Sequence, residues 1–138
     1  QVDPDTEKAV HFCFGNYGGQ IIQGGTWKDL VEFLNELHTD HLVLELAHRP
    51  TEDLEALKEV DSKIKLGIGV IDIKVNHIET ADEVAARIET AEKTLGPGRI
   101  GFIHPDCGFW MLKRSVANQK IAALAKGRDL YLGKTNLS

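Results

Sequence analysis

Short apolar runs rich in β-branched residues alternate along the chain with longer stretches whose apolar residues recur at helical spacing. The short runs predict buried β-strands, and the longer stretches predict amphipathic helices. We expect strands at residues 9–14, 41–46, 65–73 and 99–104, and helices at residues 27–37, 52–60, 81–95 and 113–126. This order, strand then helix in four units, predicts an α/β fold with parallel strands and right-handed connections.

Local signals mark where these helices begin and end. Thr80 followed by Glu83 has the form of a capping box for the third helix, and Thr26 can cap the first. The sequence at residues 96–98, Gly-Pro-Gly, ends the third helix abruptly. The connection after the first strand is rich in glycine and predicts a long loop where α/β proteins place their sites: Gly15, Gly18, Gly19, Gly24 and Gly25.

Two architectures fit four strand-helix units. One is a small open sheet of the doubly wound kind, and the other is half of a (β/α)₈ barrel, which needs about 250 residues. A half barrel leaves strand edges unpaired, and an exposed edge is a liability. If the units form half a barrel, we expect residues 1–138 to be a fragment of a larger catalytic unit. The first residue, Gln1 rather than Met, points the same way.

Composition limits the class of protein. The chain has 138 residues, a formal net charge of −5 and 42% hydrophobic residues, as expected for a single globular domain. No apolar run reaches about 18 residues, so no transmembrane helix is expected. The acidic excess argues against a nucleic-acid partner. Two cysteines are too few for a disulfide scaffold and fit a reducing compartment, so we expect a cytoplasmic protein.

Charge is distributed unevenly along the chain. Residues 1–100 carry 10 basic and 19 acidic side chains, whereas residues 101–138 carry six basic and two acidic ones. This basic end either binds a small anionic substrate or is a solvated helix face.

Four metal-ligating residue types are expected at one end of the sheet. His11 and Cys13 are two residues apart, so in a strand their side chains point to the same face near its carboxyl end. Glu45 ends the second strand and Cys107 follows the fourth. One imidazole, two thiolates and a carboxylate suit Zn²⁺. The same residues also fit two alternatives, which are buried cysteines beside a core histidine or a Cys13–Cys107 disulfide.

These motifs together resemble the catalytic barrel of the cobalamin-independent methionine synthase family. The resemblance runs from about residue 11 to residue 126 and rests on His11-Phe12-Cys13, Leu44-Glu45-Leu46 and Pro105-Asp106-Cys107-Gly108. It implies that the chain is the C-terminal half of a TIM (β/α)₈ barrel. It also implies that His11, Cys13, Glu45 and Cys107 bind Zn²⁺, which holds a small thiol substrate as a thiolate. Lys74 and Asp106 are then expected among the catalytic residues.

Two segments differ from the full-length members of that family. Those members carry a His at the position of Lys74, where it is taken to donate a proton to the leaving folate, so Lys74 argues against a folate donor. Lys74 is then either an electrostatic aid or one half of a buried pair with Asp72. Residues 108–114 look more like the short members, which include epoxyalkane:coenzyme M transferase. In such members Lys113 and Arg114 would bind an acidic group of the thiol, or they are surface charges; Trp110 would line the pocket or belong to the core.

Three functions therefore remain open at this stage. The first is a zinc-dependent methyl or alkyl transferase that acts on a thiol such as homocysteine with a methyl or alkyl donor. The second is epoxide opening by a thiol such as coenzyme M. The third is a half barrel without catalytic activity that zinc stabilises. In each case an N-terminal barrel half or a second copy of the chain is expected as a partner.

Overall fold

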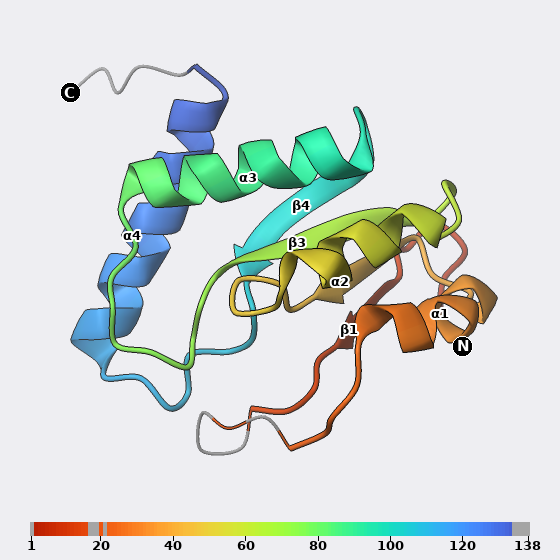
Figure 1. Cartoon of the computed structure of the whole chain (residues 1–138), viewed down its shortest axis with the longest axis horizontal. Helices are drawn as coiled ribbons and strands as arrows, with labels where there is room; N and C mark the ends of the chain where they lie inside the picture. Colours follow the sequence, from red (N-terminus) through yellow and green to blue (C-terminus); the bar gives the residue numbers. More distant parts are fainter. Residues whose placement is uncertain (1, 17–19, 21, 134–138) are drawn as a thin grey trace.

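The computed structural model describes residues 2–16, 20 and 22–133. Four strands alternate with helices along the chain, as predicted (Figure 1). The strands are β1 (Ala9–Phe12), β2 (His41–Leu44), β3 (Lys65–Ile71) and β4 (Ile100–Pro105). Of the glycines predicted to form the first loop, Gly18 and Gly19 lie outside the described residues.

The predicted helices are present, although two of them are partly 3₁₀. The first consists of the 3₁₀ turn η1 (Trp27–Leu30) and α1 (Val31–Glu36), and the second of α2 (Thr51–Ala56) and η2 (Leu57–Glu59). The third, α3 (Ala81–Leu95), has the predicted bounds. The fourth, α4 (Arg114–Tyr131), continues beyond the predicted end at residue 126 because Gly127 is buried against α3 and Tyr131 packs against the core. No helix in these described parts has the length and apolar character needed to cross a membrane.

The predicted capping box of α3 is present. The backbone amide of Glu83 donates to the Thr80 hydroxyl over 3.1 Å, and the amide of Thr80 donates to the Glu83 carboxylate over 2.6 Å. At the first helix, the amide of Thr26 donates to the Asp29 carboxylate over 3.0 Å. These contacts satisfy donors that the first turn of a helix leaves unpaired.

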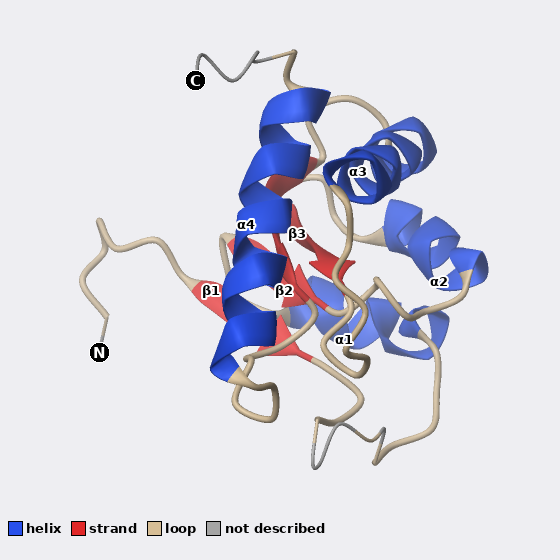
Figure 2. Cartoon of the chain, turned by 90° about the vertical axis from the view of Figure 1, so that its left-hand side faces the viewer, coloured by secondary structure: helices blue, strands red, loops and turns tan. Residues whose placement is uncertain are grey.

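The strands form one parallel sheet in the order β1-β2-β3-β4, and each strand pairs with the next along the chain. Figure 2 shows α1, α2 and α3 on the same side of this sheet. A doubly wound domain has helices on both faces of its sheet, whereas a (β/α)₈ barrel has them only outside. The α/β fold with four βα units is therefore confirmed, and the placement of these three helices is that of half a TIM barrel.

The two faces of the sheet differ in burial. Under the helices lies an apolar core that includes Leu42, Leu44, Leu66, Ile68 and Trp27. The opposite face corresponds to the inside of a barrel and is more open: His11 is exposed, and Phe102 is 46% exposed. This alternation of buried and open positions follows from the period of two residues in a strand.

Two glycines of β3 leave room for one side chain of β4 and for another that lies directly after that strand. A Cβ atom at Gly67 would lie 3.1 Å from His104 Nε2, and a Cβ atom at Gly69 would lie 2.0 Å from Asp106 Oδ1. The absence of side chains at these positions lets β4 and its carboxyl end pack closely over β3.

Candidate metal centre

Three predicted metal ligands meet at the carboxyl end of the sheet. His11 lies in β1, Cys13 follows that strand, and Cys107 lies two residues beyond β4. His11 Nε2 and Cys107 Sγ are 3.3 Å apart, and one ligand atom from each of the three residues lies within 4.8 Å of the others. Both cysteines are free thiols, which excludes the disulfide alternative in this structure.

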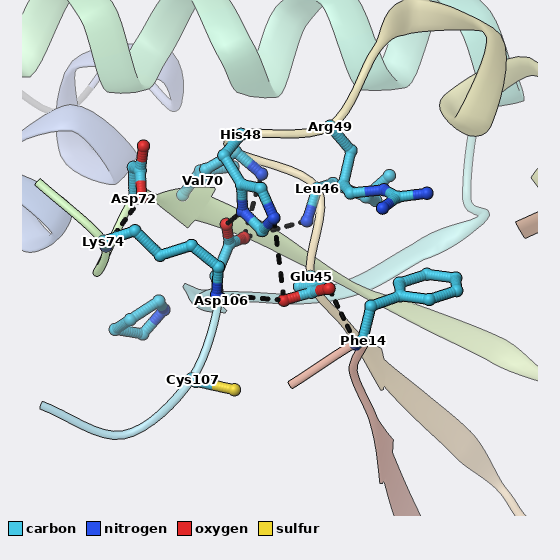
Figure 3. A network of polar contacts seen from close by, with 12 residues as sticks. Phe14, Glu45, Leu46, His48, Arg49, Val70, Asp72, Lys74, Asp106 and Cys107 are labelled. Atoms are coloured by element: carbon cyan, nitrogen blue, oxygen red, sulfur yellow. Dashed lines mark hydrogen bonds and ion pairs between the residues drawn. The ribbon is translucent and has the colours of Figure 1, made fainter. Parts of the chain in front are cut away.

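Glu45, the fourth predicted ligand, lies immediately after β2 and is completely buried. Its Oε1 accepts a hydrogen bond from the Phe14 amide over 2.8 Å, whereas its Oε2 has no hydrogen-bond partner. Lys74 Nζ is 3.7 Å and His48 Nε2 is 3.9 Å from that Oε2 (Figure 3). Glu45 is outside the group of three ligand atoms that lie within 4.8 Å of one another.

The surroundings of Cys107 favour its protonated form. Burial raises the pKa of the Cys107 thiol to about 12, with further contributions from neighbouring Cys13 and the Glu45 carboxylate, while Lys74 acts in the opposite direction. The cluster therefore gathers electron-rich groups without enough positive charge to stabilise a thiolate. A bound divalent cation would reverse this balance, because metal coordination deprotonates a thiol.

The donor set fits Zn²⁺. An imidazole nitrogen and two thiol sulfurs are ligands that this ion accepts, and they already lie together. The carboxylate oxygen Glu45 Oε2 is buried without a hydrogen bond, which is costly unless the oxygen finds a partner. His11, Cys13 and Cys107, with Glu45 beside them, are thus the residues that would hold the metal.

Asp106, expected to be catalytic, is completely buried and fully hydrogen-bonded. Its Oδ1 accepts from the amides of Leu46 and Ala47 over 2.8 and 2.9 Å, and its Oδ2 accepts from His48 Nδ1 over 2.7 Å. These contacts fix the loop between β2 and α2, directly after Glu45. They describe a carboxylate that holds neighbouring residues in place, and a catalytic role for Asp106 stays a prediction.

Lys74 reaches the same site from the loop after β3. Its ammonium donates to the Gly15 carbonyl over 3.0 Å and lies beside Glu45, and the Lys74 side chain is only 11% exposed. Asp72 does not pair with this ammonium in the structure; its Oδ1 accepts from the backbone amide of Lys74 over 2.8 Å. The ion pair of Lys74 is therefore with Glu45, and the alternative of a buried pair with Asp72 is wrong.

The predicted substrate-binding residues lie at the surface near the start of α4. Lys113 and Arg114 are exposed, and the side chain of neither forms an ion pair or hydrogen bond within the described parts of the chain. Trp110 is 64% exposed. The structure does not bring these three residues into the metal-ligand cluster, and their role in substrate binding stays a prediction.

Sequence reasoning missed two residues next to the site. His48 is held by Asp106 and points its Nε2 toward Glu45, and Lys120 of α4 is completely buried near the end of β3. A histidine three residues after a candidate ligand was a visible signal for the first. Lys120 lies on a helix that also carries exposed charges, so only packing could identify it.

Known proteins of one family resemble this chain in sequence. Residues 1–129 match the family model described as "Cobalamin-independent synthase, Catalytic domain". The chain is 31% identical over 121 residues to a methionine synthase of Thermococcus kodakarensis, covering 88% of this chain and 32% of that protein. It is 32% identical over 117 residues to a methionine synthase of Pyrococcus abyssi, covering 85% and 31%. The chain thus spans about a third of the length of these curated relatives.

A solved structure shows the same arrangement of elements. It is a B12-independent methionine synthase from Shewanella in complex with selenomethionine, and it superposes on this chain with a TM-score of 0.73 at 28% sequence identity. The superposition covers 94% of this chain and 40% of the other.

Proposed function

The chain belongs to the cobalamin-independent synthase family, within its catalytic domain, and on this premise we propose that it supplies the metal-binding half of a zinc-dependent transferase. The proposed reaction moves a methyl or alkyl group to the sulfur of a small, homocysteine-like thiol. The names of the curated relatives support methyl transfer of this kind. Residues 1–138 would form the C-terminal half of the barrel.

One observation carries this proposal. His11, Cys13 and Cys107 converge from two distant parts of the sequence. The Glu45 carboxylate contributes to the raised pKa of the Cys107 thiol, and its buried Oε2 has no hydrogen-bond partner. Cores avoid buried carboxylate oxygens that lack a hydrogen bond. A metal site accounts both for the convergence and for the carboxylate oxygen that lacks a hydrogen bond, whereas a core histidine with two buried cysteines accounts for neither.

Zinc bound by these residues would act as a Lewis acid that lowers the pKa of a substrate thiol. The protein's own groups prepare the site. The Phe14 amide orients Glu45 through Oε1 and leaves Oε2 without a hydrogen bond, 3.7 Å from Lys74 Nζ. Lys74 contributes a fixed positive charge beside Glu45, where it can stabilise negative charge that develops on a substrate.

The open face of the sheet supports the proposal of a missing barrel half. β1 and β4 are the edge strands of the sheet, and Phe102 on the open face is 46% exposed. Four more βα units, from another part of a longer chain or from a second copy, would pair with these edges and close the substrate pocket. We propose this completed barrel as the catalytic unit.

Metal analysis of the 138-residue chain tests the site. We expect one zinc ion per chain, and X-ray absorption should show one additional sulfur ligand after homocysteine or coenzyme M is added. Cys13→Ser and Cys107→Ser should each lose zinc, and His77→Gln, which changes an exposed histidine bonded to Glu83, should retain it. Retention of zinc with unchanged affinity in both serine variants would refute the metal site. Zinc binding without any response to thiols would leave only the structural role.

A second candidate reaction, the opening of an epoxide by a thiol, is favoured by Lys74. An ammonium at this position can donate a hydrogen bond to the oxygen that becomes negative when the ring opens. Thiol consumption by the completed barrel with methyl-folate, methylcobalamin or epoxypropane separates the donors. Turnover with epoxypropane alone supports this second reaction, and turnover with methyl-folate shows that Lys74 is compatible with a folate donor.

A further inference from the structure

The loop that follows β3 is held by a buried charged pair that reaches from α4. Lys120 and Glu79 both have fully buried side chains, and Lys120 Nζ lies 2.8 Å from Glu79 Oε2. The same ammonium donates to the carbonyls of Asp72, over 2.8 Å, and His77. All three hydrogens of the ammonium thus have acceptors, as a buried lysine requires.

This pair holds Asp72 from both sides of its backbone. Lys120 binds the carbonyl of Asp72, and Glu79 Oε1 accepts from the amide of Asp72 over 2.9 Å. β3 ends one residue earlier, so the sheet no longer fixes the backbone at this point. The Lys120–Glu79 pair therefore fixes the backbone at the first residue after β3, where the hydrogen bonds between strands end.

Because its own backbone is held, Asp72 in turn fixes the backbone of Lys74. The Asp72 carboxylate accepts from the Lys74 amide over 2.8 Å, which sets the direction in which the Lys74 side chain leaves the loop. That side chain then reaches across to the Gly15 carbonyl, at 3.0 Å, and to Glu45 Oε2, at 3.7 Å. A continuous series of contacts therefore joins α4 to the candidate metal centre.

We propose that Lys120 is a positioning residue for Lys74, acting through Glu79 and Asp72 to hold the Lys74 ammonium beside Glu45. The contacts themselves are independent of the function, but their consequence for the metal centre rests on the proposed function. The Lys120 ammonium forms its contacts with Asp72, His77 and Glu79, and none with the ligand cluster. Its effect on the site passes entirely through the loop at residues 72–79.

A purely structural role makes a different prediction. A buried ion pair that only supports the core would change stability when removed and would leave the metal centre as it was. A positioning role requires that the effect of Lys120 on the metal centre depend on the presence of Lys74. A double-mutant cycle measures this dependence.

The cycle uses the affinity of the 138-residue chain for Co²⁺, which binds zinc sites and is coloured. Lys74→Met removes a positive charge near the site and should tighten Co²⁺ binding by about three- to tenfold. Lys120→Met combined with Glu79→Gln removes the pair and leaves no fully buried charge. Arg87, the other partner of Glu79, is 35% exposed and keeps its hydrogen bond to the Val70 carbonyl. The double change should also tighten Co²⁺ binding. Added to Lys74→Met, the double change should have no further effect. Lys126→Met, on the exposed side of α4, is the control for loss of a lysine and should leave the affinity unchanged.

Equal effects of the double change with and without Lys74, or no effect at all, would overturn the proposal. Amide hydrogen exchange tests the same point without metal. When the pair is removed, the protection factor of the Lys74 amide should fall by about tenfold or more. The protection factor of the Glu83 amide, which is bonded to the Thr80 hydroxyl, should not change. If the native chain binds no Co²⁺, the proposed function fails and this exchange measurement alone decides the inference: unchanged protection at Lys74 refutes it.

Discussion

The carboxylate of Asp106 occupies the space that any side chain at Gly69 would need. A Cβ atom at Gly69 would lie 2.0 Å from Asp106 Oδ1 and 3.0 Å from the Leu44 carbonyl. That Oδ1 is the acceptor for the amides of Leu46 and Ala47, which follow Glu45. A glycine in the middle of a buried strand thus determines how the residues after β2 are held.

We expect Gly69→Ala to destabilise the fold by about 2–4 kcal/mol, because Asp106 must move and its buried hydrogen bonds are lost. Urea denaturation measures the change in the free energy of unfolding. Gly24→Ala is the matched control, since a Cβ atom at Gly24 meets nothing within 4 Å. Equal stability of the two variants would show that Asp106 can shift without cost.

Asp106→Asn should change the tautomer of His48. A carboxylate oxygen only accepts, so Asp106 Oδ2 requires a hydrogen on His48 Nδ1, and Nε2 of the neutral ring is then bare. In the variant, the asparagine oxygen would accept from the amides of Leu46 and Ala47, and its NH₂ group would face His48 Nδ1. The ring should therefore carry its hydrogen on Nε2, directed toward Glu45.

Nitrogen-15 chemical shifts of the His48 ring distinguish the two tautomers. His77, which is exposed and contacts Glu83, serves as the internal reference and should not change. We expect a loss of about 1–3 kcal/mol in the free energy of unfolding, because hydrogen bonds to a charged acceptor are replaced by neutral ones. The same tautomer in both proteins would contradict the assigned hydrogen bond.

Much of the fold could be predicted from sequence because the local patterns are strong. The strands of four βα units are apolar runs, and α3 carries both a capping box and a glycine stop, so its bounds were predicted correctly. The convergence of His11, Cys13 and Cys107 followed from strand ends alone. The contacts of Asp106 and the burial of Lys120 depend on how segments 41 to 60 residues apart in the sequence pack together, and no local pattern predicts them.

The stability of the protein should fall in acid partly because of Glu79. Burial alone would raise the pKa of this carboxyl, but hydrogen bonds from Lys120 and from backbone amides outweigh burial and hold the pKa below its ordinary value of 4.5. Because the pKa is lower in the folded state, Glu79 stabilises the fold above pH 4.5. That contribution is lost as the pH falls through the folded-state pKa.

Free energies of unfolding measured from pH 7 downward test this assignment. Below pH 4.5 the native protein should lose stability more steeply than Glu79→Gln, which cannot titrate at this position. Glu89→Gln, which changes an exposed partner of Lys93, should keep the native slope. If the free energies of unfolding of the native protein and Glu79→Gln fall equally steeply below pH 4.5, other groups cause the acid sensitivity.

Glu45→Gln should weaken zinc binding while the chain remains folded. The glutamine Oε1 can still accept from the Phe14 amide, so the position of the side chain is kept, but a neutral NH₂ group replaces Oε2, the oxygen that lacks a hydrogen bond. We expect the zinc affinity to fall by at least about 10–100-fold, the loss typical even of residues that only support a ligand. Competition with a coloured chelator measures this affinity, and circular dichroism verifies the fold.

Glu52→Gln, an exposed change on α2, is the control. Native zinc affinity in Glu45→Gln would restrict the metal site to His11, Cys13 and Cys107, with Glu45 serving only as the partner of Lys74.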